Sequence, residues 1–72
     1  MDWSGCDLVE RVEGKVSGRP VVRGTRILAD TIEQYAARDA SIAEIREDYP
    51  SLTEETVERM VGYVKAQRVP AG

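Results

Sequence analysis

The residues with the clearest potential for chemistry lie in one segment, GKVSGRPVVRGTRIL, at residues 14–28. This segment holds four basic side chains and no acidic one, although the whole chain carries a net charge of −3. On turns or short strands, guanidinium groups reach phosphate oxygens through two hydrogen bonds at once. The candidate nucleic-acid-binding residues are therefore Lys15, Arg19, Arg23 and Arg26.

A structural role for the same segment is an alternative. Gly18 and Gly24 satisfy the backbone of tight turns as well as they permit close approach of a ligand. Residues 30–58 carry nine acidic and two basic side chains. The arginines of the segment can therefore neutralise acidic helices of the same chain or of a dimer partner, and the two interpretations stay open at this point.

The sequence lacks the usual groups of an enzyme active site. It contains no histidine and a single cysteine, Cys6, which argues against an ordinary zinc site. Ser4 and Cys6 are possible nucleophiles without a recognisable general base, and no Walker or Rossmann glycine motif is present. We expect no catalytic activity and no metal, cofactor or small-molecule ligand.

Length and composition predict one small folded domain. A chain of 72 residues buries only about 60% of the surface that its unfolded form exposes, so we expect it to gain stability as a homodimer or with a partner. No apolar run is long enough to cross a bilayer, and the N-terminus does not resemble a signal peptide. A lone cysteine predicts a free thiol, and we expect a cytoplasmic protein.

The first part of the domain is predicted to be a short β element, because β-branched residues alternate there with glycine, serine and proline. We expect extended segments at residues 15–16 and 20–22, with a turn over residues 17–19 between them. A second turn is expected over residues 23–25. Residues 1–13 precede this hairpin as an N-terminal extension that can add one more short strand.

From Asp30 onward the apolar residues recur with helical spacing and predict three helices. The first is expected to begin with Asp30 as its N-cap. The second begins with Ser41 and Glu44 in a capping box and ends before Pro50. The third begins with Thr53 as its N-cap.

The third helix has an apolar stripe and an internal glycine. The stripe consists of Val57, Met60, Val61 and Val64. Gly62 costs about 1 kcal/mol relative to alanine in a helix interior. It indicates either that another backbone comes close to this helix or that the position has no particular role.

These elements predict a mainly α fold with a short N-terminal β element, a three-helix, helix-turn-helix-like domain over residues 14–68. A frayed tail is expected at residues 69–72. The second and third helices match a helix-turn-helix in scale. However, Glu54, Glu55 and Glu58 at the leading end of the third helix make it a poor reader of DNA, and an ordinary three-helix cluster explains the pattern equally well.

The stretch GRPVVRGTRILADTIEQYAARDASIAEIREDYPSLTEETV resembles a bacterial and archaeal family, domain-of-unknown-function family 433. The likeness covers most of the chain, from about Gly14 to Val64. The motif residues carried over are Pro20, Arg23, Gly24, Thr25, Arg26, Tyr49, Pro50, Leu52 and Thr53. The family pattern places proline after RGTRI or one residue later, whereas this chain has Leu28 and Ala29 there.

The resemblance implies a helix-turn-helix-like fold and a role similar to that of VapB-type antitoxins, which are often encoded beside a PIN-like ribonuclease toxin. Such a toxin holds metal with clustered carboxylates, and a basic side chain entering the cluster would displace the ion. Lys65 and Arg68 on the basic C-terminal segment are the candidate partner-binding residues, with Arg23 and Arg26 second.

Three functional hypotheses follow. The first is a homodimeric antitoxin that neutralises a PIN-like toxin and binds its own promoter DNA. The second is a DNA-binding transcriptional regulator without a toxin. The third is a structural homodimer module in which the arginines form ion pairs, so that replacing Arg26 lowers stability more than any binding.

Overall fold

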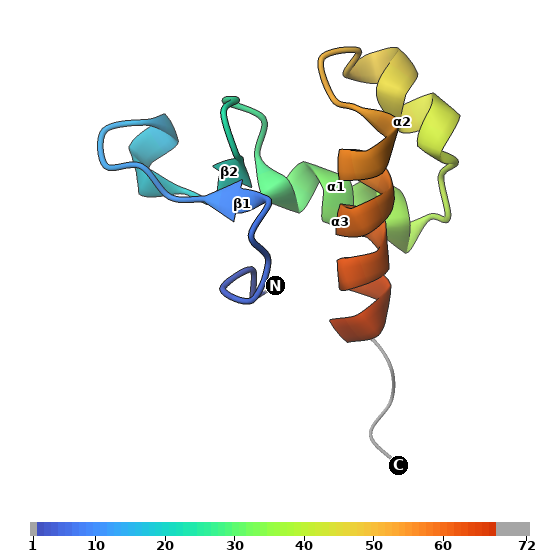
Figure 1. Cartoon of the computed structure of the whole chain (residues 1–72), viewed down its shortest axis with the longest axis horizontal. Helices are drawn as coiled ribbons and strands as arrows, with labels where there is room; N and C mark the ends of the chain where they lie inside the picture. The colour runs from blue at the N-terminus through green and yellow to red at the C-terminus, as the bar shows by residue number, and fades with distance from the viewer. Residues whose placement is uncertain (1, 68–72) are drawn as a thin grey trace.

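The structure, a computed structural model that describes residues 2–67, is mainly helical with a small sheet near its N-terminus (Figure 1). The strands are β1 (Val9–Glu10) and β2 (Val21–Val22), separated by the 3-10 turn η1 (Val16–Gly18). Three helices follow, and this confirms the predicted fold class. They are α1 (Ala29–Ala37), α2 (Ile42–Asp48) and α3 (Glu54–Gln67). None of the helices among residues 2–67 has the length and apolar character that a membrane span requires.

The partner of β2 differs from the predicted one. β2 pairs with β1 in an antiparallel register that places Val9 opposite Val22 and Glu10 opposite Val21. The strand expected at residues 15–16 is wrong, because Val16 adopts a positive φ of 49° and begins η1. The chain therefore leaves the sheet after Glu10 and returns to it only at Val21.

The start of α1 also differs from the prediction. Leu28 is the N-cap and provides no side-chain cap, whereas Asp30 lies inside the first turn. The Asp30 carboxylate instead accepts a hydrogen bond from the Trp3 indole N–H, with 2.9 Å between Nε1 and Oδ1. Near the positive end of the helix dipole this position still suits a carboxylate. Asp30 therefore does not cap α1 but forms a long-range hydrogen bond with Trp3.

Ser41 and Thr53 cap α2 and α3 as predicted, but the capping box expected for α2 is only half formed, because the Glu44 carboxylate pairs with Arg38 and not with the Ser41 backbone. The Ser41 hydroxyl accepts from the Glu44 backbone N–H at 3.1 Å, and the Thr53 hydroxyl accepts from the Thr56 N–H at the same distance. The Glu44 side chain forms an ion pair with Arg38 at 2.6 Å. These contacts satisfy N–H groups that lack a partner within the helix.

The core lies where α3 crosses the other two helices, and the N-terminal residues close one end of it. The buried apolar side chains from the helices and their turns include Ile32, Ala36, Ile45, Leu52, Val57, Met60 and Val64. The segment before the sheet adds Trp3, with 4% of its surface exposed, and Cys6, with 8%. The frayed tail predicted for residues 69–72 lies outside the described residues.

Candidate functional site

Near its end the basic segment forms a tight turn, and the geometry of this turn accounts for the glycine and threonine of the sequence RGT. The Thr25 N–H donates to the Val22 carbonyl at 2.9 Å, which closes a four-residue turn. Gly24 sits at its third position with φ of 78°, a conformation that favours glycine. The Thr25 hydroxyl donates to the Val22 carbonyl and accepts from the Ile27 N–H. The predicted turn over residues 23–25 is thus confirmed, and we call residues 22–26 the arginine turn.

Leu28 and Ala29 connect the arginine turn to α1 without the proline of the family pattern. The Val22 N–H donates to the Ile27 carbonyl at 2.8 Å, and Leu28 forms a bridge with Val21. The Ala29 N–H then donates to the Pro20 carbonyl at 3.0 Å. Proline has no such donor. Alanine at position 29 therefore adds one backbone hydrogen bond to the hairpin that presents the turn.

Glu10 on β1 holds the base of the arginine turn. Its Oε2 accepts from the Gly24 backbone N–H at 3.0 Å and lies 3.4 Å from the Lys15 ammonium. Its Oε1 lies 3.6 Å from the Arg23 guanidinium. The hydrogen bond from Gly24 is the main reason why the pKa of Glu10 lies below its ordinary value, and the two cations lower it further.

The four candidate nucleic-acid-binding residues therefore divide into two kinds. Lys15 and Arg23 are paired with Glu10, and the Arg23 Nε–H also donates to the Asp7 carbonyl at 2.9 Å. The charge pattern suggested that the acidic helices would neutralise these residues, but their acidic partner, Glu10, lies on β1. Arg19 and Arg26 are exposed and form no ion pair with any residue between 2 and 67.

The candidate partner-binding residues lie elsewhere. Lys65 is exposed near the end of α3 and has no ion-pair partner among the residues that the structure describes. Arg68 lies outside the described residues. Lys65 is therefore not part of the groove or of the contacts that surround the arginine turn.

A groove separates the arginine turn from the connection between α2 and α3. It has a volume of about 210 Å³. Its lining residues are Leu8, Val22, Arg23, Thr25, Ser51, Leu52, Thr53 and Thr56. The two segments that carry the family resemblance, RGT and YPSLT, thus face each other across one groove. Sequence reasoning missed Ser51 and Thr56 as lining residues, because only the folded chain brings them opposite the arginine turn.

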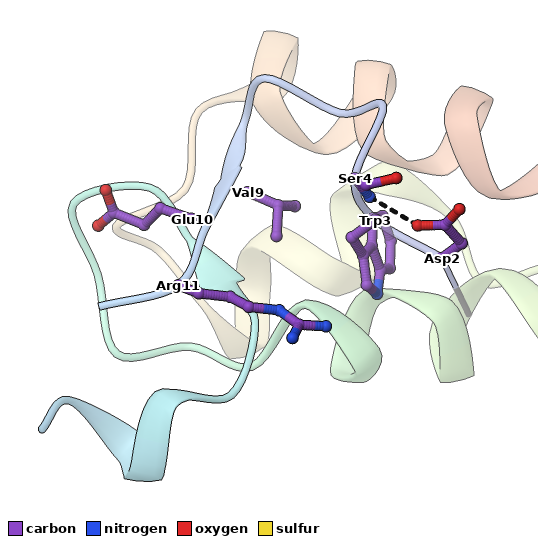
Figure 2. A pocket seen from close by; sticks show the side chains of 6 residues that line it. All are labelled: Asp2, Trp3, Ser4, Val9, Glu10 and Arg11. Atoms are coloured by element: carbon purple, nitrogen blue, oxygen red, sulfur yellow. Dashed lines mark hydrogen bonds between the residues drawn. The ribbon is translucent and has the colours of Figure 1, made fainter. Parts of the chain in front are cut away.

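A second hollow of about 210 Å³ lies beside Trp3 (Figure 2). It is lined by Asp2, Trp3, Ser4, Val9, Glu10 and Arg11. The Ser4 N–H donates to the Asp2 carboxylate at 2.9 Å, and hydrogen bonds from Ser4 lower the pKa of Asp2. In Figure 2 the Arg11 side chain extends away from Glu10. No residue of this hollow belongs to the basic segment at residues 14–28.

The leading end of α3 presents carboxylates to solvent. Glu54, Glu55 and Glu58 are exposed. The nearby hydroxyls are used by the helix itself, since Thr53 donates to Thr56 at 2.9 Å and accepts from its backbone N–H. Arg59 is bonded to Asp7 at 3.1 Å. This end of α3 therefore offers acceptors rather than cations to a binding partner.

The fold and the site define a small three-helix domain whose two sequence signatures meet at one groove. The chain belongs to the family described as Protein of unknown function (DUF433), whose family model matches residues 9–64. The match covers the strands, the arginine turn, α1, α2 and most of α3. Comparison with curated proteins and with solved structures yields no match.

Proposed function

We propose that this chain is a small antitoxin-like protein that binds and neutralises a PIN-like ribonuclease through exposed basic side chains. The observation that carries the proposal is the state of Arg26, which is exposed and has no ion-pair partner among residues 2–67. The turn that presents it is held by three hydrogen bonds involving Thr25. A preorganised turn reduces the backbone conformational entropy that is lost when its side chain binds a partner.

The chemistry of the target supports the same choice of residues. A metal-dependent ribonuclease of PIN type concentrates carboxylates around its ion, and a guanidinium binds carboxylates with two parallel hydrogen bonds. Arg26 meets this requirement, and Arg19 supplies a second free cation. Lys65, near the end of α3, and Arg68, which lies outside the described residues, remain proposed contacts for the same partner.

The proposal is tested by co-expression with the product of the neighbouring gene. We expect the two proteins to co-purify and the cleavage of a fluorogenic RNA by that product to stop when this chain is added. Arg26→Ala should weaken inhibition by about tenfold, the loss of one charge-assisted contact. Arg38→Ala is the matched control, because Arg38 is equally exposed but is paired with Glu44 on the helices.

Two results would count against the proposal. A neighbouring product without ribonuclease activity, or one that this chain fails to inhibit, removes the antitoxin function. If Arg26→Ala and Arg38→Ala inhibit equally well and truncation after Val64 abolishes inhibition, the contact belongs to the C-terminal segment and not to the arginine turn.

DNA binding is the second candidate function, and the groove favours it. Four hydroxyl-bearing side chains and Arg23 line the groove, and Arg26 follows on the same turn. Hydroxyls and arginines contact DNA phosphates and position a protein on the duplex. Ser51 and Arg26 are the groups proposed for this contact, since the hydroxyls of Thr25, Thr53 and Thr56 already bond within the chain. The acidic start of α3 supplies no comparable base-reading set, so we propose backbone contact only.

Fluorescence anisotropy on the chain's own upstream DNA tests this second function. Binding should weaken with salt, with a log–log slope of about −0.9 for each phosphate contacted. Arg26→Ala should reduce that slope by about one contact, whereas Arg38→Ala should leave it unchanged. Absence of binding at low salt, for the chain alone and with its protein partner, would exclude DNA as a ligand.

A further inference from the structure

Residues 2–10 form an arm that is packed on the rest of the chain through its own contacts. The Trp3 ring stacks on Tyr63 of α3, with 5.5 Å between ring centroids and 19° between planes. Its indole N–H donates to Asp30 of α1. Cys6 is buried beside it, and β1 pairs with β2 at the end of the arm. The arm therefore supplies core, helix and sheet contacts to the body, residues 20–67.

Polar contacts fix the edges of the same interface. Tyr63 donates its hydroxyl hydrogen to the Asp2 carbonyl at 2.8 Å, and Arg59 contacts the Asp7 carboxylate at 3.1 Å. Arg23 donates to the Asp7 carbonyl. All of these contacts are between the arm and the body, so none of them depends on which copy of the chain provides the arm.

The connector, residues 11–19, joins the arm to the body without contributing to the hydrophobic core. None of its residues belongs to the hydrophobic core or packs against it. In Figure 1 the connector runs out from β1, away from the three helices, and turns back through η1 to β2. Its link to the sheet is the ion pair between Lys15 and Glu10.

The reversal of the connector is strained. Val16 has φ of 49° and Ser17 has φ of 56°, and both are flanked by glycines with positive φ, Gly14 at 80° and Gly18 at 72°. Side chains with a Cβ rarely adopt this region, and a β-branched residue such as valine is a clear outlier there. The strained residues lie where the connector turns back toward β2.

We propose that two copies of this chain form a dimer by exchanging their N-terminal arms, each arm packing on the body of the other copy. Exchange keeps every contact between the arm and the body, because that interface is identical within and between chains. It also removes the need for the connector to reverse, so Val16 and Ser17 can leave the positive-φ region. The occupant of each Trp3 site is then the arm of a second copy.

Substitutions in the connector test the proposal on the full chain, with the dimer dissociation constant measured by sedimentation velocity over a concentration series. We expect the wild-type chain to show a monomer–dimer equilibrium. Val16→Gly should weaken the dimer by about tenfold, because glycine accepts the positive φ of the closed form. Gly14→Pro should strengthen it, because proline cannot adopt φ of 80° and prevents the closed turn.

Matched controls lie in the same connector. Val12→Gly makes the same substitution as Val16→Gly at an exposed residue outside the positive-φ set, and it should not change the dissociation constant. Glu13→Pro introduces proline at the second position of the turn closed by the Lys15 N–H and the Val12 carbonyl, a position that favours proline. It should leave the closed form and the dissociation constant unchanged.

A charge exchange distinguishes arm exchange from association of two closed copies. Asp7→Arg and Arg59→Asp each place like charges at one arm–body contact. In an arm-exchanged heterodimer of these two variants, both contacts regain opposite charges. After joint refolding, native mass spectrometry should show the heterodimer about threefold above its statistical share.

Each result decides for or against the arm exchange. A wild-type chain that stays monomeric at every concentration overturns it, and so does a heterodimer at the statistical share. Equal dissociation constants for Val16→Gly and Val12→Gly also contradict it. The measurements need no toxin and no DNA, so their failure leaves the proposed antitoxin function untouched.

Discussion

At the scale of single residues, the basic segment contains two functional kinds of cation. Lys15 and Arg23 share the carboxylate of Glu10, whereas Arg26 has no ion-pair partner among residues 2–67 and lies on a turn whose hydrogen bonds do not involve its side chain. An ion pair positions a group, and a free cation remains available to a partner. We therefore propose that Glu10 and Arg23 hold the arginine turn in place and that Arg26 contacts the binding partner.

Arginine replacements separate these roles through stability. Arg23→Ala removes a donor to the Asp7 carbonyl and an ion pair, and we expect it to lower the free energy of unfolding by about 1 kcal/mol. Arg26→Ala should change it by less than about 0.5 kcal/mol, as is usual for a surface residue without contacts. Urea unfolding checks both values. A larger loss for Arg26→Ala would instead favour the structural-module hypothesis.

Glu10 should make stability depend on pH. Its pKa in the folded state lies below the value of 4.5 for the free side chain, so its contribution is present above that value and is lost as the pH falls through the folded pKa. Glu10→Gln should therefore flatten the acid side of the stability profile measured by thermal unfolding. Glu13→Gln, a change to an exposed carboxylate in the connector, should leave that side as in the wild-type chain.

At the scale of elements, α2 and α3 were predicted because their start signals are local. Ser41 and Thr53 bond to N–H groups three residues ahead, and Pro50 ends α2 through the restriction on the residue before it. The start of α1 was not predicted, because Asp30 is engaged by Trp3 across 27 residues. The pairing of β1 with β2 was not predicted either, because strands of two residues carry almost no periodic signal in the sequence.

Replacing Gly62 inside α3 should stabilise the protein. A Cβ built on Gly62 meets no atom within 4 Å, so no part of the described chain requires a glycine there. Gly62→Ala should raise the free energy of unfolding by about 1 kcal/mol, measured by urea unfolding. Gly5→Ala is the contrasting change, because its Cβ would lie 3.1 Å from the Tyr63 hydroxyl. A destabilising Gly62→Ala would show that another copy or a partner packs on this face.

The contact between α1 and α2 should weaken in alkaline solution. The Tyr35 hydroxyl donates to Asp48, and this hydrogen bond is the main cause that raises the pKa of Tyr35 from 10.0 to about 12. A raised pKa means that the contribution is full below pH 10 and is lost as the pH rises toward 12. Tyr35→Phe should remove that alkaline loss from the thermal unfolding profile. An unchanged profile would show that the bond contributes nothing to stability.

At the scale of the whole molecule, the sequence identified the basic turn but not the surface that it completes. Arg23, Gly24 and Thr25 stood out by type and spacing. The position of Arg23 and Thr25 across a groove from Ser51 and Thr56 depends on the folded arrangement of segments far apart in the sequence, which no local pattern encodes. Trp3 could be recognised as needing cover, but its site between α1 and α3 required the fold.

Arg26 lies on a small domain in which five basic side chains of residues 2–67 are engaged in ion pairs or hydrogen bonds, namely Lys15, Arg23, Arg38, Arg46 and Arg59. Its core is completed by an arm that reaches α1 and α3, and its arginine turn is tied to that arm through Glu10 and Asp7. Loss of the arm should therefore disturb the site as well as the core. This coupling predicts that a substitution which detaches the arm from the body also weakens the affinity for the partner.

The most direct test of the account is inhibition of the neighbouring gene product by the wild-type chain and by its Arg26→Ala and Arg38→Ala variants. The readout is the inhibition constant for RNA cleavage, with urea unfolding showing that all three proteins are folded. The account predicts strong inhibition by the wild-type and Arg38→Ala chains and inhibition about tenfold weaker for Arg26→Ala. Ribonuclease activity that persists with the wild-type chain present would contradict it.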